Sequence, residues 1–253
     1  MKFDELDKKM RVFEEAGDIS IIPGLFVVVR LDGRSFSRLT HETKKFEVPF
    51  DEIFHNAMVA TTEHCMKCGF RAIFGYTQSD EISILLHADD NLFDRKSRKI
   101  ISIFSGEASG FFSLKVGIPA AFDSRICVLP SQEVVTDYFR WRSEDANRNA
   151  LNSYCYWTLR KEGMSVKSAT EQLKNLSTSE KNQLLFERKI NYNNVPSWQK
   201  RGTCLYFGAT KKAGINKLTG ECVSTSRRVI KKESDLPLGK AFNDWISGIL
   251  PKL

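Results

Sequence analysis

The stretch LFVVVRLDGRSF, residues Leu25–Phe36, decides the fold that this chain is expected to adopt. Its first part, Leu25–Leu31, is β-branched and almost continuously apolar, which is typical of a central strand covered on both faces. Asp32 and Gly33 end that strand, and Arg34–Phe36 lead into a helix. The strand therefore predicts where the core lies, and its polar end predicts a sheet edge at which chemistry can occur.

The segments that follow alternate between helical and strand patterns. Pro49–Cys68 carries apolar residues at helical spacing, and Asp94 can cap a second helix that runs to about Leu114. Between and after them we expect three further strands, of which the first two form a hairpin. These strands are Arg71–Tyr76, Glu81–His87 and Ala121–Leu129. The order β-α-β-β-α-β predicts an α+β fold with a ferredoxin-like sheet.

The second half of the chain has mostly helical patterns and ends in a basic β-ribbon. The predicted helices are Ser131–Glu162, Val166–Asn175 and Thr178–Lys189. Gly202–Gly208 and Cys222–Lys231 form the ribbon, joined across Gly214 and Gly220. We expect residues 1–130 to form a domain around the βαββαβ sheet and residues 131–253 to pack on it as part of one compact unit.

Composition excludes several classes of protein. The chain has 253 residues, of which 42% are hydrophobic and 27% charged, so it is neither a disordered tail protein nor a fibre. No apolar run reaches the roughly 18 residues of a membrane span, and the N-terminus is too acidic for a signal peptide. We expect a soluble, cytoplasmic protein. The net charge is +7, and residues 208–253 hold nine Lys or Arg against four Asp or Glu, which favours an anionic partner such as nucleic acid.

Three acidic residues are the candidate catalytic groups. Asp32 ends the first strand, and Asp80 and Glu81 lie at the hairpin between the second and third strands. In a βαββαβ sheet these strands are central neighbours, so the acids meet at one edge, where they repel each other unless a cation intervenes. Mg²⁺ suits one or two carboxylates together with substrate phosphates, and two such ions promote phosphoryl transfer. The alternative is that Asp32-Gly33 is an ordinary turn and Ser79–Glu81 an ordinary hairpin tip.

Features near these acids suit a phosphate group. Gly33 lets the backbone approach a phosphate or a metal closely, and the helix entered at Arg34–Phe36 offers N–H groups to phosphate. Lys96 and Lys99 are three residues apart on one helix face and could clamp a triphosphate. A solvated basic face is an equally good interpretation of those two lysines.

Five motifs in order resemble the tRNA(His) guanylyltransferase family, from about residue 5 to residue 207. They are RLDGRSF (Arg30–Phe36), YTQSDEIS (Tyr76–Ser83), FDSR (Phe122–Arg125), WRSEDANRNAL (Trp141–Leu151) and KINYNN (Lys189–Asn194). The resemblance implies a catalytic domain with the polymerase palm fold. It also implies a nucleotidyltransferase that adenylylates the 5′ end of tRNA with ATP, after which the 3′-hydroxyl of GTP or another NTP attacks that end. Some members repair tRNA by polymerising in the 3′-to-5′ direction.

The resemblance implies a role for each matching position. Two Mg²⁺ ions would be held by Asp32, Asp80 and the carbonyl of Gly33, with Glu81 supporting them electrostatically. The nucleotide-binding residues would be Asp32, Gly33, Arg34, Ser35, Phe36, Ser37, Ser79, Asp80, Lys96, Lys99 and Arg125. Arg142 and Asn149 would lie near the tRNA end, and the ribbon residues Arg227, Arg228, Lys231 and Lys232 are our candidates for a further tRNA surface. The family also implies a homotetramer.

Two departures from the family pattern affect specificity. Members dedicated to tRNA(His) carry His-Ile-Asn-Asn-Leu-Tyr-Asn where this chain has Asn147–Ser153, NRNALNS, which lacks the histidine. We therefore favour template-directed repair of truncated tRNA, with G addition to tRNA(His) as the alternative. Many relatives also have a lysine at the position of Val48, and Lys44 or Lys45 could replace it.

Two more remote functions remain open. A palm-fold nucleotidyl cyclase would use similar acids, but its hairpin has a Gly-Gly-Asp/Glu-Glu-Phe pattern, whereas Gln78–Ile82 reads QSDEI. A non-catalytic RNA-binding module would display aromatic residues on its central strands. The strand sequences LFVVVRL and EISILLH do not have that pattern.

Overall fold

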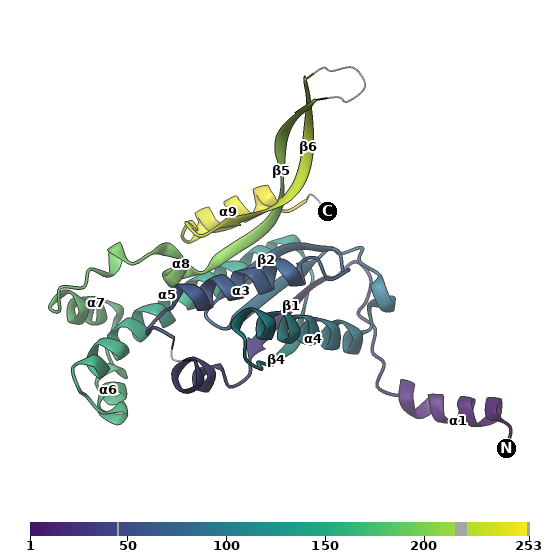
Figure 1. Ribbon diagram of the computed structural model, residues 1–253, viewed down its shortest axis with the longest axis horizontal. Coiled ribbons are helices and arrows are strands. Elements are labelled where there is room, and N and C mark those ends of the chain that lie inside the picture. Colours follow the sequence, from purple (N-terminus) through teal and green to yellow (C-terminus); the bar gives the residue numbers. More distant parts are fainter. Residues whose placement is uncertain (45, 216–221, 252–253) are drawn as a thin grey trace.

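A six-stranded antiparallel sheet with helices on both faces organises the computed structural model (Figure 1). The structure describes residues 1–44, 46–215 and 222–251. The first half contains α1 (Phe3–Glu15), β1 (Phe26–Gly33), α2 (Phe36–Arg38), a π-helical turn (Leu39–Thr43), α3 (Glu52–Cys65), β2 (Ala72–Gln78), β3 (Glu81–Leu86), a 3-10 turn (Leu92–Arg95), α4 (Ser97–Val116) and β4 (Phe122–Leu129). The second half contains α5 (Gln132–Lys161), α6 (Val166–Leu173), α7 (Thr178–Phe186), a 3-10 turn (Tyr192–Asn194), α8 (Ser197–Arg201), β5 (Thr203–Ile215), β6 (Cys222–Glu233) and α9 (Lys240–Ile249).

The strand order is β4-β1-β3-β2-β5-β6, and each strand is antiparallel to its neighbours. β1 therefore lies inside the sheet between β3 and β4, as its apolar sequence predicts. Val28, Val29 and Leu31 are fully buried there. This mixed helix-and-strand architecture confirms the α+β class expected from the sequence.

Alternate residues of β1 contribute to two separate cores. Val27, Val29 and Leu31 pack under α3 and α4, whereas Phe26 and Val28 pack against α5 and α9 on the opposite face. A third apolar cluster joins the C-terminal half of α5 to α6 and α7. Because α5 belongs to two of these cores, it ties the sheet to the helical part of the chain.

The start of α4 differs from the sequence prediction. The helix begins at Ser97, not at Asp94, because Phe93, Asp94 and Arg95 all have φ near +55°. The Arg95 side chain is buried and donates hydrogen bonds to backbone carbonyls. Its acceptors are the oxygens of Ile21, Leu25, Ala88 and Asp90. This arginine therefore fastens the segment before β1 to the body instead of lying on the helix surface.

Other element boundaries also differ. α3 is shorter than predicted and starts at Glu52, where the Asp51 carboxylate accepts the Phe54 N–H as a helix cap. The ribbon strands are longer than predicted and extend beyond the body (Figure 1). The sequence analysis also missed α9, which follows the ribbon and covers the sheet with Phe242 and Ile246. Among the described residues, no helix is long and apolar enough to cross a membrane.

Candidate active site

The three candidate acids meet at one edge of the sheet, as predicted. Asp32 and Glu81 are directly paired across β1 and β3, and the Gly33 N–H donates to the carbonyl of Asp80 at 3.0 Å. Asp80 follows Ser79 in the two-residue turn between β2 and β3, and Ser79 has a φ of +52°. The hairpin turn and the end of β1 therefore hold Asp32 and Asp80 next to each other through backbone contacts.

The electrostatics of this edge favour a bound cation. Burial, together with the neighbouring carboxylates of Asp32 and Glu81, raises the pKa of Asp80 to about 6. The pKa of Asp32 is also raised, first by burial and then by Glu81 and Asp123. Asp123, the cross-strand partner of Asp32 on β4, was not among the predicted site residues, although it stands in the FDSR motif. A cation between these carboxylates would relieve their repulsion.

Glu81 is already neutralised by two arginines. Its carboxylate forms ion pairs with Arg30 on β1 and with Arg142 on α5. Arg142 is only 7% exposed and also lies 3.3 Å from the carboxylate of Asp145. Glu81 therefore connects this edge of the sheet to α5, and Asp32 and Asp80 are the carboxylates better placed to bind a metal.

The donor set fits Mg²⁺ on chemical grounds. Within the described part of the chain, no cluster of three or more His, Cys, Asp or Glu side chains could hold a metal ion. Mg²⁺ does not require such a cluster, because it uses one or two carboxylates and completes its shell with water and phosphate oxygens. The Asp32–Asp80 pair, with the Gly33 backbone beside it, supplies that minimal set.

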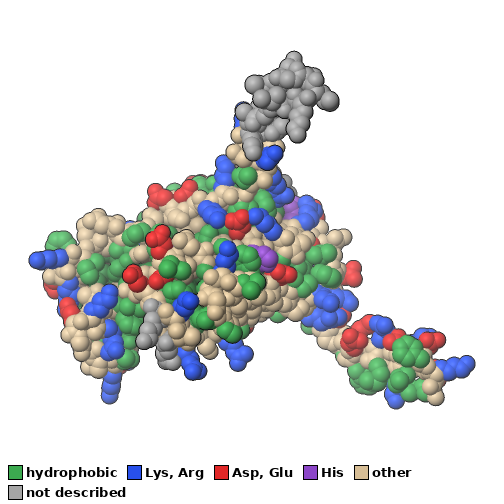
Figure 2. Space-filling model, in the orientation of Figure 1, with side chains coloured by type: hydrophobic (Ala, Val, Ile, Leu, Met, Phe, Trp, Pro, Cys, Tyr) green, Lys and Arg blue, Asp and Glu red, His purple; other side chains and the backbone are tan. Residues whose placement is uncertain are grey.

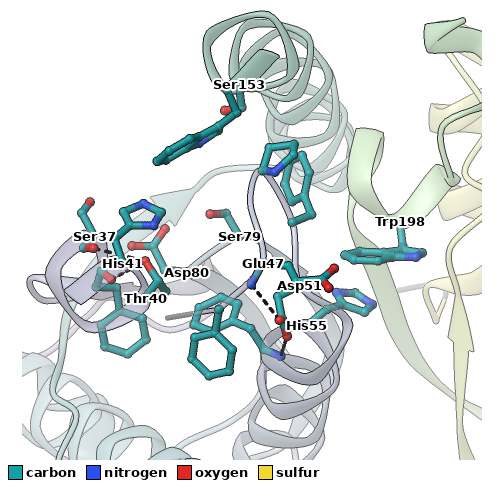
Figure 3. A pocket seen from close by; sticks show the side chains of 16 residues that line it. Ser37, Thr40, His41, Glu47, Asp51, His55, Ser79, Asp80, Ser153 and Trp198 are labelled. Atoms are coloured by element: carbon teal, nitrogen blue, oxygen red, sulfur yellow. Dashed lines mark hydrogen bonds between the residues drawn. The ribbon is translucent and has the colours of Figure 1, made fainter. Parts of the chain in front are cut away.

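A pocket of about 260 Å³ opens beside Asp80 (Figure 3). It is lined by residues from both halves of the chain. Asp80 lies with Ser37, Thr40 and His41 at one end, and Trp198 and His55 lie at the other. The pocket is therefore complete only when the helical second half of the chain packs against the first half.

Two pairs of aromatic rings line this pocket. His41 and Trp157 have ring centroids 5.0 Å apart, and His55 stacks on Trp198 at 4.2 Å. Burial lowers the pKa of His55 to about 4, so this imidazole is neutral at pH 7. These four rings come from segments far apart in the sequence, so no local pattern marks them as site residues.

The predicted nucleotide-binding residues fall into separate groups. Phe36, Ser37, Ser79 and Asp80 line the pocket, whereas Arg34 and Ser35 line a shallower cavity beside the loop before β4. The Arg125 guanidinium is 3.8 Å from the Asp32 carboxylate. Of the described side chains, those lining the Asp80 pocket do not include the two predicted lysines. Lys96 instead pairs with Asp18 at 2.7 Å, and the ammonium of Lys99 lies 5.6 Å from the ring centroid of Phe93.

The predicted tRNA-contacting residues also divide. Arg142 and Asn149 line a small cavity of about 140 Å³ that also contains Asp80 and Glu81. The four ribbon cations (Arg227, Arg228, Lys231 and Lys232) are all exposed on β6, and Figure 2 shows Lys and Arg side chains around the base of the ribbon. Lys232 is 2.8 Å from the Glu63 carboxylate, so it also attaches the ribbon to α3.

One side chain that the sequence analysis missed approaches Val48. The ammonium of Lys161, near the end of α5, donates to the carbonyl of Val48 at 3.2 Å. Lys44, one of the two predicted replacements for the family lysine, is exposed at the end of the π-helical turn. The other, Lys45, lies outside the described residues. Only folding brings Lys161 to this position, because 113 positions separate it from Val48.

Comparison with known proteins identifies the family. Residues 7–130 match the family described as tRNAHis guanylyltransferase (Thg1), and residues 133–239 match the Thg1 C terminal domain. A probable tRNA(His) guanylyltransferase of Drosophila melanogaster is 33% identical over 206 residues, which cover 78% of this chain and 71% of that protein.

Solved structures agree with this match. A bacterial tRNA(His) guanylyltransferase (Thg1)-like protein in complex with ATP has a TM-score of 0.72 at 26% identity, covering 96% of this chain and 97% of that one. A bacterial protein of the same description in complex with GTP has a TM-score of 0.69 at 25% identity, covering 97% of this chain and 98% of that one. The resemblance drawn from the five motifs is confirmed: the chain belongs to the tRNA(His) guanylyltransferase family and is a nucleotidyltransferase.

Proposed function

We propose that this protein is a template-dependent 3′-to-5′ nucleotidyltransferase that repairs the 5′ end of truncated tRNA. The observation that carries this proposal is the Asp32–Asp80 carboxylate pair beside a pocket lined with aromatic and hydroxyl side chains. Carboxylates suit a metal that binds phosphates, and aromatic rings suit a nucleobase. The similar bacterial structures in complex with ATP and GTP support nucleotides as the ligands of this pocket.

Different residues of the site would contact different parts of the nucleotide and the tRNA end. Ser37 and Ser79 offer hydroxyl groups to the nucleotide, and the ring pairs flank the space that a base would fill. Arg125 brings a guanidinium to the reacting edge, where it can stabilise negative charge on a phosphate. We propose that Lys96 and Lys99 also bind the triphosphate. Because Lys96 is paired with Asp18, it would have to leave that ion pair to reach the phosphates. We propose that Asn149 contacts the tRNA end directly and that Arg142 acts there through Glu81.

The metal site is proposed on the same residues. Asp32, Asp80 and the carbonyl of Gly33 would hold two Mg²⁺ ions. When bound, Mg²⁺ supplies charge neutralisation between carboxylate and phosphate oxygens and lowers the pKa of an attacking hydroxyl. The chain supplies positioning, through the backbone contact between Gly33 and Asp80 and through the neutralised Glu81.

Template-dependent repair is favoured over tRNA(His) marking by the segment Asn147–Ser153. Asn147 stands where dedicated members have histidine, and both its backbone carbonyl and its side-chain oxygen accept hydrogen bonds from the Tyr192 hydroxyl, at 3.2 and 3.3 Å. This position therefore contributes to packing between α5 and the segment after α7. A residue occupied in this way is poorly suited to reading one particular tRNA.

The palm fold and the oligomer are parts of the same proposal. The strand order β4-β1-β3-β2 with α3 and α4 on one face agrees with a ferredoxin-like palm. The division at residue 130, the homotetramer, the contact of Arg227, Arg228, Lys231 and Lys232 with tRNA and the cytoplasmic location remain predictions.

The test uses two radiolabelled 5′-monophosphate tRNAs with ATP, Mg²⁺ and all four NTPs. One is tRNA(His) without its extra guanosine, and the other is a different tRNA without its first nucleotide. We expect the second to be extended by the templated base, and we expect Asp80→Asn to abolish that extension. Asp244→Asn, which removes an exposed carboxylate on α9, is the matched control and is expected to be fully active.

The other outcomes separate the alternatives. Addition of G to tRNA(His) alone would establish the family's tRNA(His) reaction and refute repair. A cyclic product from GTP without tRNA would point to a cyclase. Binding of tRNA with no nucleotide addition under any condition would point to a non-catalytic RNA-binding module.

A further inference from the structure

The face of the sheet that carries Asp32 is only partly covered. Arg30 and Asp32 continue the face on which Phe26 and Val28 pack under α5 and α9. Near the end of β1 these helices no longer cover the face. The side chains of Asp32, Asp123 and Arg125 are 36%, 58% and 56% exposed there. These three residues form an open floor on β1 and β4 next to the catalytic edge.

Trp141 lies on the flank of α5 that borders this floor. Its helical neighbours Tyr138 and Arg142 reach the sheet, where the Tyr138 hydroxyl meets that of Ser83 at 3.1 Å and Arg142 pairs with Glu81. Phe139, two positions before Trp141, lies on the opposite side of α5, where its ring meets that of Phe74 on β2 with centroids 4.7 Å apart. α9 lies on that side too, since its Trp245 contacts Tyr206 on the next strand, β5. Trp141 therefore lies on the side of α5 toward the β1–β4 floor.

The ring of Trp141 is held in place and still open to solvent. Tyr138 meets it edge-on with centroids 5.8 Å apart, and the guanidinium of Arg142 lies 4.8 Å from its centroid. Arg142 is itself fixed by Glu81 and Asp145, so the ring rests on an immobilised charged group. Despite these contacts, 52% of the Trp141 surface is exposed. A large aromatic ring that is both fixed and exposed is suited to binding a flat partner.

The surroundings favour a nucleobase over another protein surface. The neighbouring floor consists of charged residues, Asp32, Asp123 and Arg125, which would have to be desolvated under an apolar protein contact. RNA satisfies both features at once, because bases stack on aromatic rings while phosphates pair with guanidinium groups and with metals held by carboxylates. The floor also adjoins the edge at which the reacting phosphate must lie.

We propose that Trp141 is a positioning residue that stacks on a nucleobase at the reacting end of the substrate, on the α5 side of Asp32 and outside the Asp80 pocket. This inference rests on the proposed function. The base belongs either to the end of the tRNA acceptor stem or to the incoming nucleotide. Both have the same stacking chemistry, and the structure favours the tRNA, because the floor is exposed to solvent and lies outside the pocket that we propose for the nucleotide.

The test compares wild type with Trp141→Ala, Trp141→Phe and Trp141→Leu. Loss of one base–aromatic stack corresponds to about a 5- to 150-fold weakening. We expect Trp141→Ala and Trp141→Leu to raise the Kd of a 5′-truncated acceptor-stem RNA by that factor, and Trp141→Phe to retain most of the affinity. Phe186→Ala, which removes another exposed ring on α7 (66% exposed), is the control. Binding is measured without ATP, so the result does not depend on which nucleotide the enzyme adds.

A kinetic arm identifies the source of the base. An increased KM for tRNA, with kcat and the KM for the incoming NTP unchanged, assigns the stack to tRNA. An increased KM for the NTP alone assigns it to the nucleotide. Unchanged RNA affinity and unchanged KM values in Trp141→Leu would overturn the proposal. So would a change in sedimentation of that variant, since the ring would then belong to a contact with a second copy.

Discussion

The ion-pair network around Glu81 leads to a quantitative prediction for Glu81→Gln. This carboxylate, 23% exposed, neutralises Arg30 and Arg142, whose side chains are 17% and 7% exposed. Breaking a buried ion pair by removing one partner costs roughly 3–5 kcal/mol, because the remaining charge stays uncompensated. Partial exposure of Glu81 lowers this cost, so we expect the free energy of unfolding to fall by about 2–4 kcal/mol.

The assay is thermal and urea unfolding of the protein, followed by circular dichroism without Mg²⁺ or nucleotide. For a chain of this size, the expected loss corresponds to a fall in Tm of about 4–16 °C. Glu162→Gln is the matched control, because Glu162 also pairs with an arginine through two contacts, at 2.7 and 3.1 Å, but is 43% exposed. We expect this control to lose less than about 1 kcal/mol.

A third variant tests whether Glu81 is the centre of the network. Arg142→Met leaves Glu81 paired with Arg30, so its loss of stability should be smaller than that of Glu81→Gln. Equal losses in Glu81→Gln and Glu162→Gln would refute the reasoning. A larger loss of stability in Arg142→Met than in Glu81→Gln would show that the contacts of α5, not the Glu81 carboxylate, stabilise the site.

Three further predictions follow from the site. Because the pKa of Asp80 is about 6 in the folded protein and its ordinary value is near 4, the metal-free protein should lose stability as pH rises from about 4 to 6. Asp80→Asn should therefore raise the Tm at pH 8 but not at pH 4, and an equal Tm for both proteins at pH 8 would contradict this. Neutralising Arg227, Arg228 and Lys231, which are exposed on β6, should weaken tRNA binding and flatten its salt dependence in a filter-binding assay. An unchanged slope of log affinity against log salt concentration would show that the ribbon does not contact tRNA. The ammonium of Lys161 lies beside Val48, where it can replace the family lysine. Lys161→Met should therefore reduce the rate of 5′ adenylylation about tenfold in a single-turnover assay. Lys167→Met, on α6, is the control and should leave that rate unchanged.

The central sheet and the meeting of Asp32, Asp80 and Glu81 at its edge were predictable because local sequence patterns determine them. The apolar run Leu25–Leu31 and the short hairpin turn at Ser79–Asp80 specify two central strands, and the acids at their ends then have to meet. The positive φ angles at Phe93–Arg95 were not predictable, because they depend on a buried arginine that contacts segments far away in the sequence. The same holds for the aromatic walls of the pocket. Residues such as His55 and Trp198 meet only after α8 has packed against α3.

The sheet has a consequence for how this protein is synthesised. β5 pairs with β2, and α9 covers the sheet face that carries Phe26, Val28 and Phe74. Both elements are translated after residue 200, whereas the strands that they protect are complete by Leu129. At about 5–20 residues per second, the 120 residues from Leu129 to Ile249, the end of α9, take roughly 6–24 s to synthesise, and part of the apolar sheet face stays uncovered for that time. The strand edge of β2 stays unpaired until β5 follows. Demand for a chaperone should therefore be greatest while the helical half is still emerging from the ribosome, and a truncated message ending before β5 should yield an aggregating product.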